Sequence, residues 1–164
     1  VHHIVGQQIS GAAQQSIWRK MQAAGIISPA RLAACAPEDL RPFGVSLRKA
    51  QYICDFARRV RDGSFDLNVL YELSDEEVIA RLTDIKGVGV WTAEMLLLFC
   101  LKRPNVLSFG DLGVRRGLCA VYGHKEINKK LFEKYRRRFS PYGSVAAFYL
   151  WAAGAEKTAQ AARK

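Results

Sequence analysis

Residues 74–101 read SDEEVIARLTDIKGVGVWTAEMLLLFCL, and this stretch decides the fold. It begins with Ser74 three residues before Glu77, the capping-box pattern that starts a helix. The turn that follows contains Gly87 and Gly89, which accommodate positive φ angles and leave the backbone amides open to a large partner. The segment after the turn is apolar on nearly every face, as in a buried helix. The sequence therefore predicts a helix-hairpin-helix at about residues 74–101.

The turn also has the features of an anion site. Its amides lead into the N-terminus of the second helix, where unpaired N–H groups and the helix dipole favour a phosphate. A Gly-x-Gly between two helices is equally often only a tight connection, so the turn alone leaves both interpretations open.

Composition and charge indicate the kind of partner. The 164 residues are 49% apolar, enough for one domain or two intimate lobes with a sizeable core, and the formal net charge is +10. This basicity favours a polyanion, nucleic acid first, although charge alone also fits a basic protein without such a partner. No apolar run is long enough for a membrane span and no signal peptide is visible, so we expect an intracellular protein, in the cytoplasm and nucleoid or in a nucleus. The first residues resemble the middle of a helix, which indicates missing upstream sequence.

Helical periodicity accounts for the rest of the chain. Helices are expected at residues 11–24, 29–35, 46–62, 111–122 and 128–139, with a last long helix from Ser140 and a fraying tail at 156–164. Three arginines, Arg58, Arg59 and Arg61, fit the end of their helix, where the dipole favours cations. There is no period-two strand and no repeat, so the chain is predicted to be all-α.

Few residues in the sequence are candidates for catalysis or metal binding. The four cysteines are widely separated in apolar stretches, which indicates buried thiols and argues against zinc or an iron–sulfur cluster. His2, His3 and His124 are expected at the surface, and no catalytic triad order or Walker loop occurs. One carboxylate is conspicuous: Asp111 follows an apolar run at a predicted helix start. A helix N-cap is the simpler interpretation of it.

Several segments together resemble a known family. Residues 82–93 (LTDIKGVGVWTA), with Asp111 twenty residues after Trp91, resemble the helix-hairpin-helix (HhH-GPD) DNA glycosylase superfamily. The AlkA-like branch, the 3-methyladenine DNA glycosylase II type, is the most similar, and the likeness extends to residues 4–10 and from Pro141 to Trp151. It implies a two-lobed helical fold with a cleft between the lobes. Residues 1–103 would form the lobe with the hairpin, and 104–164 a second lobe that carries Asp111 and lacks its N-terminal portion here.

The resemblance implies an active site around Asp111, which matches the family's essential aspartate facing the sugar of a flipped-out nucleotide. A carboxylate suits N-glycosidic cleavage because C1′ gains positive charge as the base departs, and a fixed anion stabilises that charge and orients water. Lyase members of the superfamily carry a lysine just before the Thr-Ala of the second helix, where this chain has Trp91. A monofunctional enzyme that leaves an abasic site is therefore expected.

The resemblance also assigns the base pocket. Trp91 and Trp151 match tryptophans of the branch, and indoles suit alkylated purines, which are electron-poor and often cationic. Met95 stands where a branch member has an aromatic residue, so the pocket shape is expected to differ. From the residues alone, each tryptophan also fits a large core position, and for Trp151 the core position is the better interpretation.

DNA contacts are implied at the hairpin and near the N-terminus. Gln8 matches the wedge that fills the gap left by the extruded base, although a helix-capping role also fits it. A monovalent cation, Na⁺ or K⁺, is implied at the backbone carbonyls of Thr83, Ile85 and Val88, since carbonyls suit hard cations. Phosphate contacts are expected from Lys86, Gly87, Val88, Gly89 and Thr92.

These expectations define a function. The chain is expected to be a monomeric DNA glycosylase of base excision repair that hydrolyses alkylated purines from double-stranded DNA, with no required cofactor and no membrane partner. Two alternatives stay open: a non-enzymatic helix-hairpin-helix module that binds DNA, and a glycosylase for a different lesion.

Overall fold

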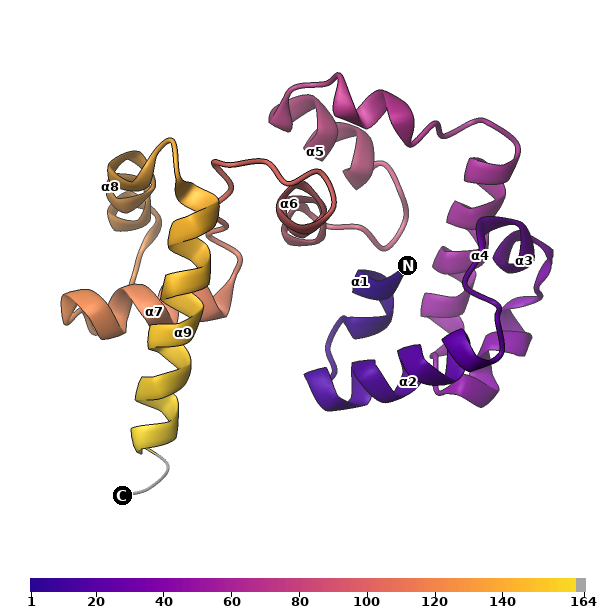
Figure 1. Cartoon of the computed structure of the whole chain (residues 1–164), viewed down its shortest axis with the longest axis horizontal. Coiled ribbons are helices and arrows are strands. Elements are labelled where there is room, and N and C mark those ends of the chain that lie inside the picture. Colours follow the sequence, from indigo (N-terminus) through magenta and orange to yellow (C-terminus); the bar gives the residue numbers. More distant parts are fainter. Residues whose placement is uncertain (162–164) are drawn as a thin grey trace. The chain divides into compact units, whose positions relative to one another are not determined.

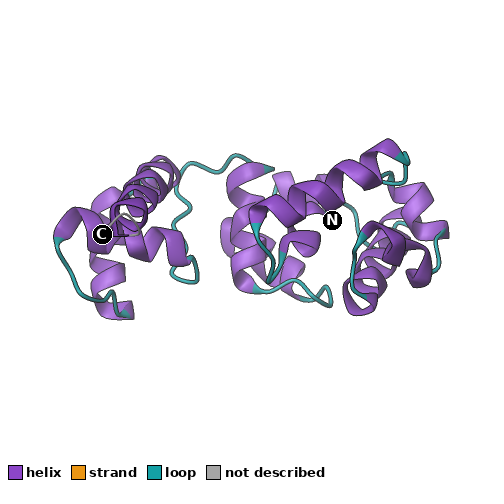
Figure 2. Cartoon of the chain, turned by 90° about the horizontal axis from the view of Figure 1, so that it is seen from below, coloured by secondary structure: helices purple, strands orange, loops and turns teal. Residues whose placement is uncertain are grey.

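The computed structural model describes residues 1–161, and within that range the protein is built from helices and connecting loops alone (Figures 1 and 2). The all-α prediction is confirmed. None of the helices in this range is long and apolar enough to cross a membrane. In chain order the elements are α1 (His2–Gly6), α2 (Gly11–Ala23), α3 (Pro29–Ala34), the 3-10 helix η1 (Pro37–Phe43), α4 (Leu47–Arg61), the 3-10 helix η2 (Asn68–Tyr71), α5 (Asp75–Thr83), α6 (Val90–Phe99), α7 (Leu112–Tyr122), α8 (Lys129–Phe139) and α9 (Gly143–Ala161).

Side-chain caps fix where several helices begin. Ser10 accepts a hydrogen bond from the backbone N–H of Ala13, and Asn128 accepts one from that of Leu131. At α5 the capping box is complete, because Ser74 accepts from the N–H of Glu77 while the Glu77 carboxylate accepts from that of Ser74. Each cap satisfies a backbone N–H that the first helical turn leaves without a partner. These starts agree with the sequence predictions.

The last helix differs from the prediction at both ends. It begins at Gly143 rather than Ser140, because the residue before a proline is disfavoured in the helical region and Ser140 is extended at ψ 137. The tail was expected to fray from residue 156, but α9 continues through Ala161. Residues 162–164, the end of that expected tail, lie outside the described part of the chain.

The chain divides into two compact units, Val1–Thr92 and Ala93–Lys164. The second unit begins earlier than the boundary expected after residue 103, because side chains of α6 contact it: the Ser108 hydroxyl donates to the Glu94 carboxylate, and Phe99 stacks on Trp151.

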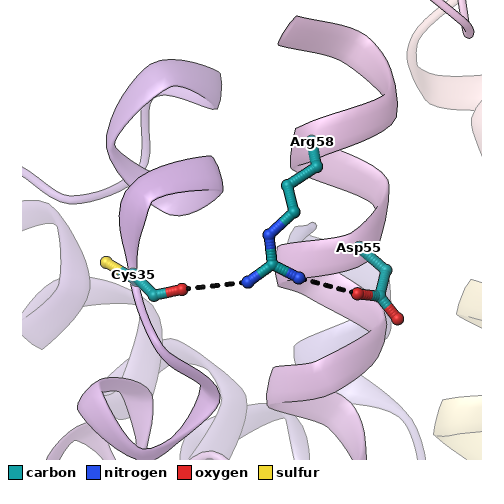
Figure 3. A network of polar contacts seen from close by, with 3 residues as sticks. All are labelled: Cys35, Asp55 and Arg58. Atoms are coloured by element: carbon teal, nitrogen blue, oxygen red, sulfur yellow. Dashed lines mark hydrogen bonds and ion pairs between the residues drawn. The ribbon is translucent and has the colours of Figure 1, made fainter. Parts of the chain in front are cut away.

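In the first unit, α4 is the central element, with α1, α3 and η1 packed against it. Its inner face consists of Ala50, Ile53, Cys54 and Ala57, all buried. Arg58 joins α4 to the end of α3 by donating to the carbonyl of Cys35 at 3.3 Å and to Asp55 at 2.9 Å (Figure 3). The guanidinium of Arg59 lies 5.6 Å from the centroid of the Phe65 ring. Both arginines therefore stabilise the first unit.

In the second unit, α7 and α9 form the main contact. Two glycines permit it: a Cβ at Gly117 would lie 2.1 Å from the carbonyl oxygen of Leu150, and one at Gly154 would lie 3.0 Å from the Gly117 nitrogen. The buried core around this contact consists of Leu107, Val114, Leu118, Ile127, Phe132, Tyr135, Ala147 and Leu150.

Candidate functional site

Asp111 is the N-cap of α7, and its side chain is only 7% exposed. Its Oδ1 accepts the backbone N–H of Val114 at 2.9 Å. The capping interpretation of this residue is therefore confirmed. A cap does not exclude a chemical role, because the same helix terminus supplies dipoles that stabilise a negative charge on the carboxylate.

Trp151 connects Asp111 to α9. Its indole N–H donates to the same Oδ1 of Asp111 at 3.0 Å. The approach depends on Gly113, where a Cβ would lie 2.6 Å from Cδ1 of Trp151 and 3.1 Å from Oδ1 of Asp111. The structure thus brings together two of the predicted site residues, and it does so over a glycine.

The indole of Trp151 is itself held by two phenylalanines. Phe99 of α6 stacks on it with ring centroids 5.9 Å apart and planes at 8°, and Phe148 meets it edge-on at 5.4 Å. Phe99 and Phe148 are each about half exposed, at 46% and 51%. A buried carboxylate therefore lies beside a partly open aromatic cluster, an arrangement suited to a flat, electron-poor ligand.

A second carboxylate lies near Asp111. Glu94 of α6 accepts a hydrogen bond from the hydroxyl of Ser108, which is 1% exposed. Burial raises the pKa of Glu94 above 4.5, the negative charge of Asp111 raises it further, and the Ser108 hydrogen bond and Arg136 oppose the shift. Glu94 therefore holds a proton more readily than an exposed glutamate does.

The hairpin turn of the first unit is shaped by Gly87. Its φ is +84°, and a Cβ there would lie 2.2 Å from the ring of Tyr52. Gly89 differs from the expectation, because its φ is not among the positive values. No heavy atom lies within 4 Å of where its Cβ would be, so Gly89 keeps the backbone open to a partner.

Gln7 ties the N-terminal turn to the hairpin. Its side-chain amide donates to the carbonyl of Gly87 at 2.7 Å and to Oγ1 of Thr92 at 3.3 Å. Lys49 donates to the carbonyls of Val5 and Gln7 at 2.9 and 2.6 Å, which fixes the chain just before Gln8.

Gln8 is held in a left-handed conformation, with φ at +57°, and is exposed. A glutamine seldom adopts this conformation, and the cost is met where surrounding contacts enforce it. A hollow of about 520 Å³ lies between Gln8 and the hairpin, lined by Gln7, Gln8, Gly87, Val88, Gly89, Trp91 and Thr92. All of these residues except Gln7 were predicted from the sequence as base-pocket or DNA-binding residues, and they therefore line one surface.

The remaining predicted residues are placed differently. Lys86 is exposed and lines another hollow, with Tyr52 and Asp84 among its neighbours. Trp91 is 39% exposed, whereas Met95 is 4% exposed, so Met95 has the burial of a core residue. Thr92 is also 4% exposed and faces Gln7.

The three carbonyls of the expected cation site lie in the α5 end and the turn. Thr83 is the last residue of α5, so its carbonyl has no partner within the helix. The carbonyl of Ile85 accepts the N–H of Val88 at 3.0 Å and retains a second lone pair. This donor set is compatible with a hard monovalent cation.

Within residues 1–161, no group of three or more His, Cys, Asp or Glu residues is arranged to hold a metal ion. The four cysteines are free thiols. Cys54 is buried as expected, Cys35 and Cys119 are partly buried, and Cys100, just past the end of α6 at Phe99, is exposed, which corrects the prediction for that residue.

Sequence reasoning missed several residues that support the site, among them Gln7, Glu94, Phe99, Ser108 and Phe148. Glu94 carried a signal, since it is the one charge in the apolar segment 93–101. Gln7, Phe99 and Ser108 depend on contacts distant in the chain, such as the one from Gln7 to Thr92.

Comparison with known proteins identifies relatives of this chain. A family model described as "HhH-GPD superfamily base excision DNA repair protein" matches residues 1–141. DNA-3-methyladenine glycosylase 1 of Schizosaccharomyces pombe is 31% identical over 157 residues, covering 92% of this chain and 69% of that protein. The Bacillus subtilis protein YfjP is 32% identical over 127 residues, covering 75% of this chain and 43% of YfjP.

Solved structures give the same result. The DNA-3-methyladenine glycosidase of Bacillus halodurans has a TM-score of 0.80 at 41% identity, covering 93% of this chain and 72% of that one. The S. pombe glycosylase Mag1, solved in complex with abasic DNA, has a TM-score of 0.81 at 31% identity, covering 92% and 76%. The chain thus spans between 43% and 76% of the length of these relatives.

Proposed function

Because the chain belongs to the HhH-GPD superfamily of base excision DNA repair proteins, we propose that it is a DNA glycosylase that hydrolyses alkylated purines of the 3-methyladenine type from double-stranded DNA. The observation that carries the proposal is the pairing of Asp111 with Trp151, a buried carboxylate bonded to an indole N–H at 3.0 Å. The names of its relatives in B. halodurans and S. pombe support the same substrate class.

Asp111 supplies the chemistry in this proposal. As the N-glycosidic bond breaks, the electron pair leaves with the base and C1′ becomes positively charged. A carboxylate held by the Val114 N–H and the Trp151 indole is fixed before the reaction begins, so its charge stabilises the developing cation without reorganisation. The same carboxylate orients the water that attacks C1′ and takes up its proton, which yields an abasic site.

Aromatic and backbone groups bind the substrate. Trp151 provides a face on which a cationic purine stacks, and Trp91 is assigned the same role on the surface of its own unit. Gln8 fills the space left by the extruded base, a step that offsets an unstacking cost of about a few kcal/mol. The amides of Gly87 and Gly89 bind phosphate independently of sequence, with Lys86, Val88 and Thr92 beside them and a Na⁺ or K⁺ ion at the carbonyls of Thr83, Ile85 and Val88.

The reaction is proposed to be purely hydrolytic. A lyase needs an amine that forms a Schiff base with C1′, and an indole at position 91 has none to offer. Borohydride treatment during turnover is therefore expected to trap no covalent protein–DNA adduct.

The test is mass analysis of bases released from DNA treated with a methylating agent. Wild-type protein is expected to release 3-methyladenine, and Asp111→Asn to release about 1,000-fold less or none, since its charge stabilisation is lost. Asn keeps an oxygen for the Val114 N–H, so the melting temperature is expected to change little. Release of a different base would identify another lesion, and tight DNA binding without any release would favour a non-enzymatic module.

A further inference from the structure

A groove of about 760 Å³ lies in the second unit and shares no lining residue with the hollow at the hairpin turn. Its walls come from α7, α9 and the loop at residues 123–127. The side chains used below are Leu112, Arg115 and Arg116 from α7, Lys125 from the loop and Lys157 from α9.

The helix contact explains why these side chains converge. Leu112, Arg115 and Arg116 are spaced i, i+3 and i+4, so they share one face of α7. Gly154 lies on α9 three residues before Lys157, and a Cβ there would lie 3.1 Å from the carbonyl oxygen of Gly113. The close approach of the two helices at Gly154 therefore places Lys157 of α9 beside the same groove as Arg115 and Arg116 of α7.

The groove is strongly basic, and one nitrogen of a side chain that lines it has no hydrogen-bond partner. Four cations line it against a single acid, Glu126, and Arg116, Lys125 and Lys157 are exposed. Arg115 packs its guanidinium 5.3 Å from the centroid of the Phe109 ring. Its Nε is buried and has no hydrogen-bond partner within the described residues. A buried donor without a partner is costly, so this arginine gains from any rearrangement that brings an acceptor to it.

The position of the groove along α7, just after Asp111, favours a DNA phosphate as the anion. Arg115 and Arg116 follow Asp111 by four and five residues, so their backbones lie about 6 to 7.5 Å farther along the helix axis at 1.5 Å per residue. Phosphates of one DNA strand recur about every 3.4 Å along the duplex axis. A strand whose sugar faces Asp111 and whose backbone runs along α7 would therefore place neighbouring phosphates within reach of these side chains.

We propose that this groove binds the phosphodiester backbone next to the nucleotide being excised, with Arg115 and Arg116 as the main donors and Lys125 and Lys157 beside them. The planar guanidinium fork matches two phosphate oxygens, which a lysine or a neutral donor does not. An acidic peptide is a weaker fit, because nothing in its chemistry ties it to Asp111. The proposal rests on the proposed function for its ligand, DNA, and adds a second backbone contact to the one at the hairpin.

The test measures how binding depends on salt. The probe is a duplex containing a tetrahydrofuran abasic analogue, and the double variant Arg116→Glu/Lys157→Glu is compared with Lys20→Glu/Arg41→Glu, which makes the same charge change on α2 and η1. Each phosphate contact contributes about 0.9 to the slope of log K against log[salt]. The groove variant, Arg116→Glu/Lys157→Glu, is expected to reduce the magnitude of this slope by about 1 to 2. The Lys20→Glu/Arg41→Glu control is expected to change it by less than about 0.3. All four side chains are exposed, so melting temperatures serve as a folding check.

A methylphosphonate scan locates the contact. Neutralising single phosphates on either side of the abasic analogue is expected to weaken binding by wild type about tenfold at one or two positions, and to have no further effect on the groove variant. An equal slope change in both double variants, or identical scans for wild type and groove variant, would overturn the proposal. Base release by wild type is measured in parallel: its failure contradicts the proposed function, whereas the binding results decide the groove.

Discussion

The indole N–H of Trp151 donates to Oδ1 of Asp111 across 3.0 Å, although the two residues lie 40 positions apart. The same oxygen accepts the backbone N–H of Val114, so one carboxylate oxygen is fixed by a side chain of α9 and by the first turn of α7. This arrangement fixes the orientation of the carboxylate before substrate arrives.

Trp151→Phe removes the indole donor and keeps an aromatic face. A hydrogen bond to a charged group contributes about 1.5–3 kcal/mol, so we expect kcat to fall about 10- to 100-fold while KM changes less than threefold. Single-turnover and steady-state kinetics on a methylated duplex measure the two constants. An increase in KM with kcat unchanged would show that the indole serves binding alone.

Gly113→Ala places a methyl group where Cδ1 of Trp151 would lie 2.6 Å away. The indole has to shift, and a displacement of about 1 Å near the reacting atoms costs about 100-fold in rate. Overpacking of this kind also costs about 1–3 kcal/mol of stability, read from urea denaturation. The matched control is Gly11→Ala, where no heavy atom lies within 4 Å of the added Cβ. Equal activity of the two variants would contradict the role assigned to Gly113.

Glu94→Gln tests the buried second carboxylate through pH. Burial raises the pKa of Glu94 above its value of 4.5 in the unfolded chain, so its stabilising contribution is full below pH 4.5 and is lost as the pH rises through the raised value. Asp111 strengthens this loss, and Ser108 and Arg136 weaken it.

Glutamine carries no charge and still accepts the Ser108 hydroxyl. We therefore expect the melting temperature of Glu94→Gln, relative to wild type, to be about 1–4 °C higher at pH 7 than at pH 4. Scanning calorimetry between these pH values measures the difference. A relative melting temperature that falls as the pH rises would show that the ionised form of Glu94 stabilises the fold.

The Gln8→Gly variant relieves the backbone strain at position 8 and also removes the side chain. Stability reports the first effect and base release reports the second. Glycine adopts a φ of +57° freely, so the variant is expected to be more stable by about 1 kcal/mol. Base release is nevertheless expected to fall at least tenfold, because no side chain remains to fill the gap in the duplex. Gln8→Asn tolerates the same φ with a shorter amide and should give intermediate activity. Full activity of the glycine variant would rule out the wedge.

Capping and apolar periodicity act within a few positions of the chain, so the helices and the residues at which most of them begin are predictable from the sequence. Ser74 with Glu77 specified the start of α5, and Asp111 specified that of α7. Local chemistry also singled out Asp111 and the hairpin glycines as candidates. The prediction that the last helix begins at Ser140 was wrong, because Ser140 precedes Pro141 and is extended.

Which of these residues act together depends on contacts between segments that are distant in the chain. The contact between Trp151 and Asp111 requires Gly113 to lie beneath the indole, and the hydrogen bonds from Gln7 to Gly87 and Thr92 join positions at least 80 residues apart. The basic groove likewise exists because Gly154 lets α9 approach α7. Such contacts depend on how closely two backbones approach, a property of packing between distant segments that the order of residues along any one segment does not express.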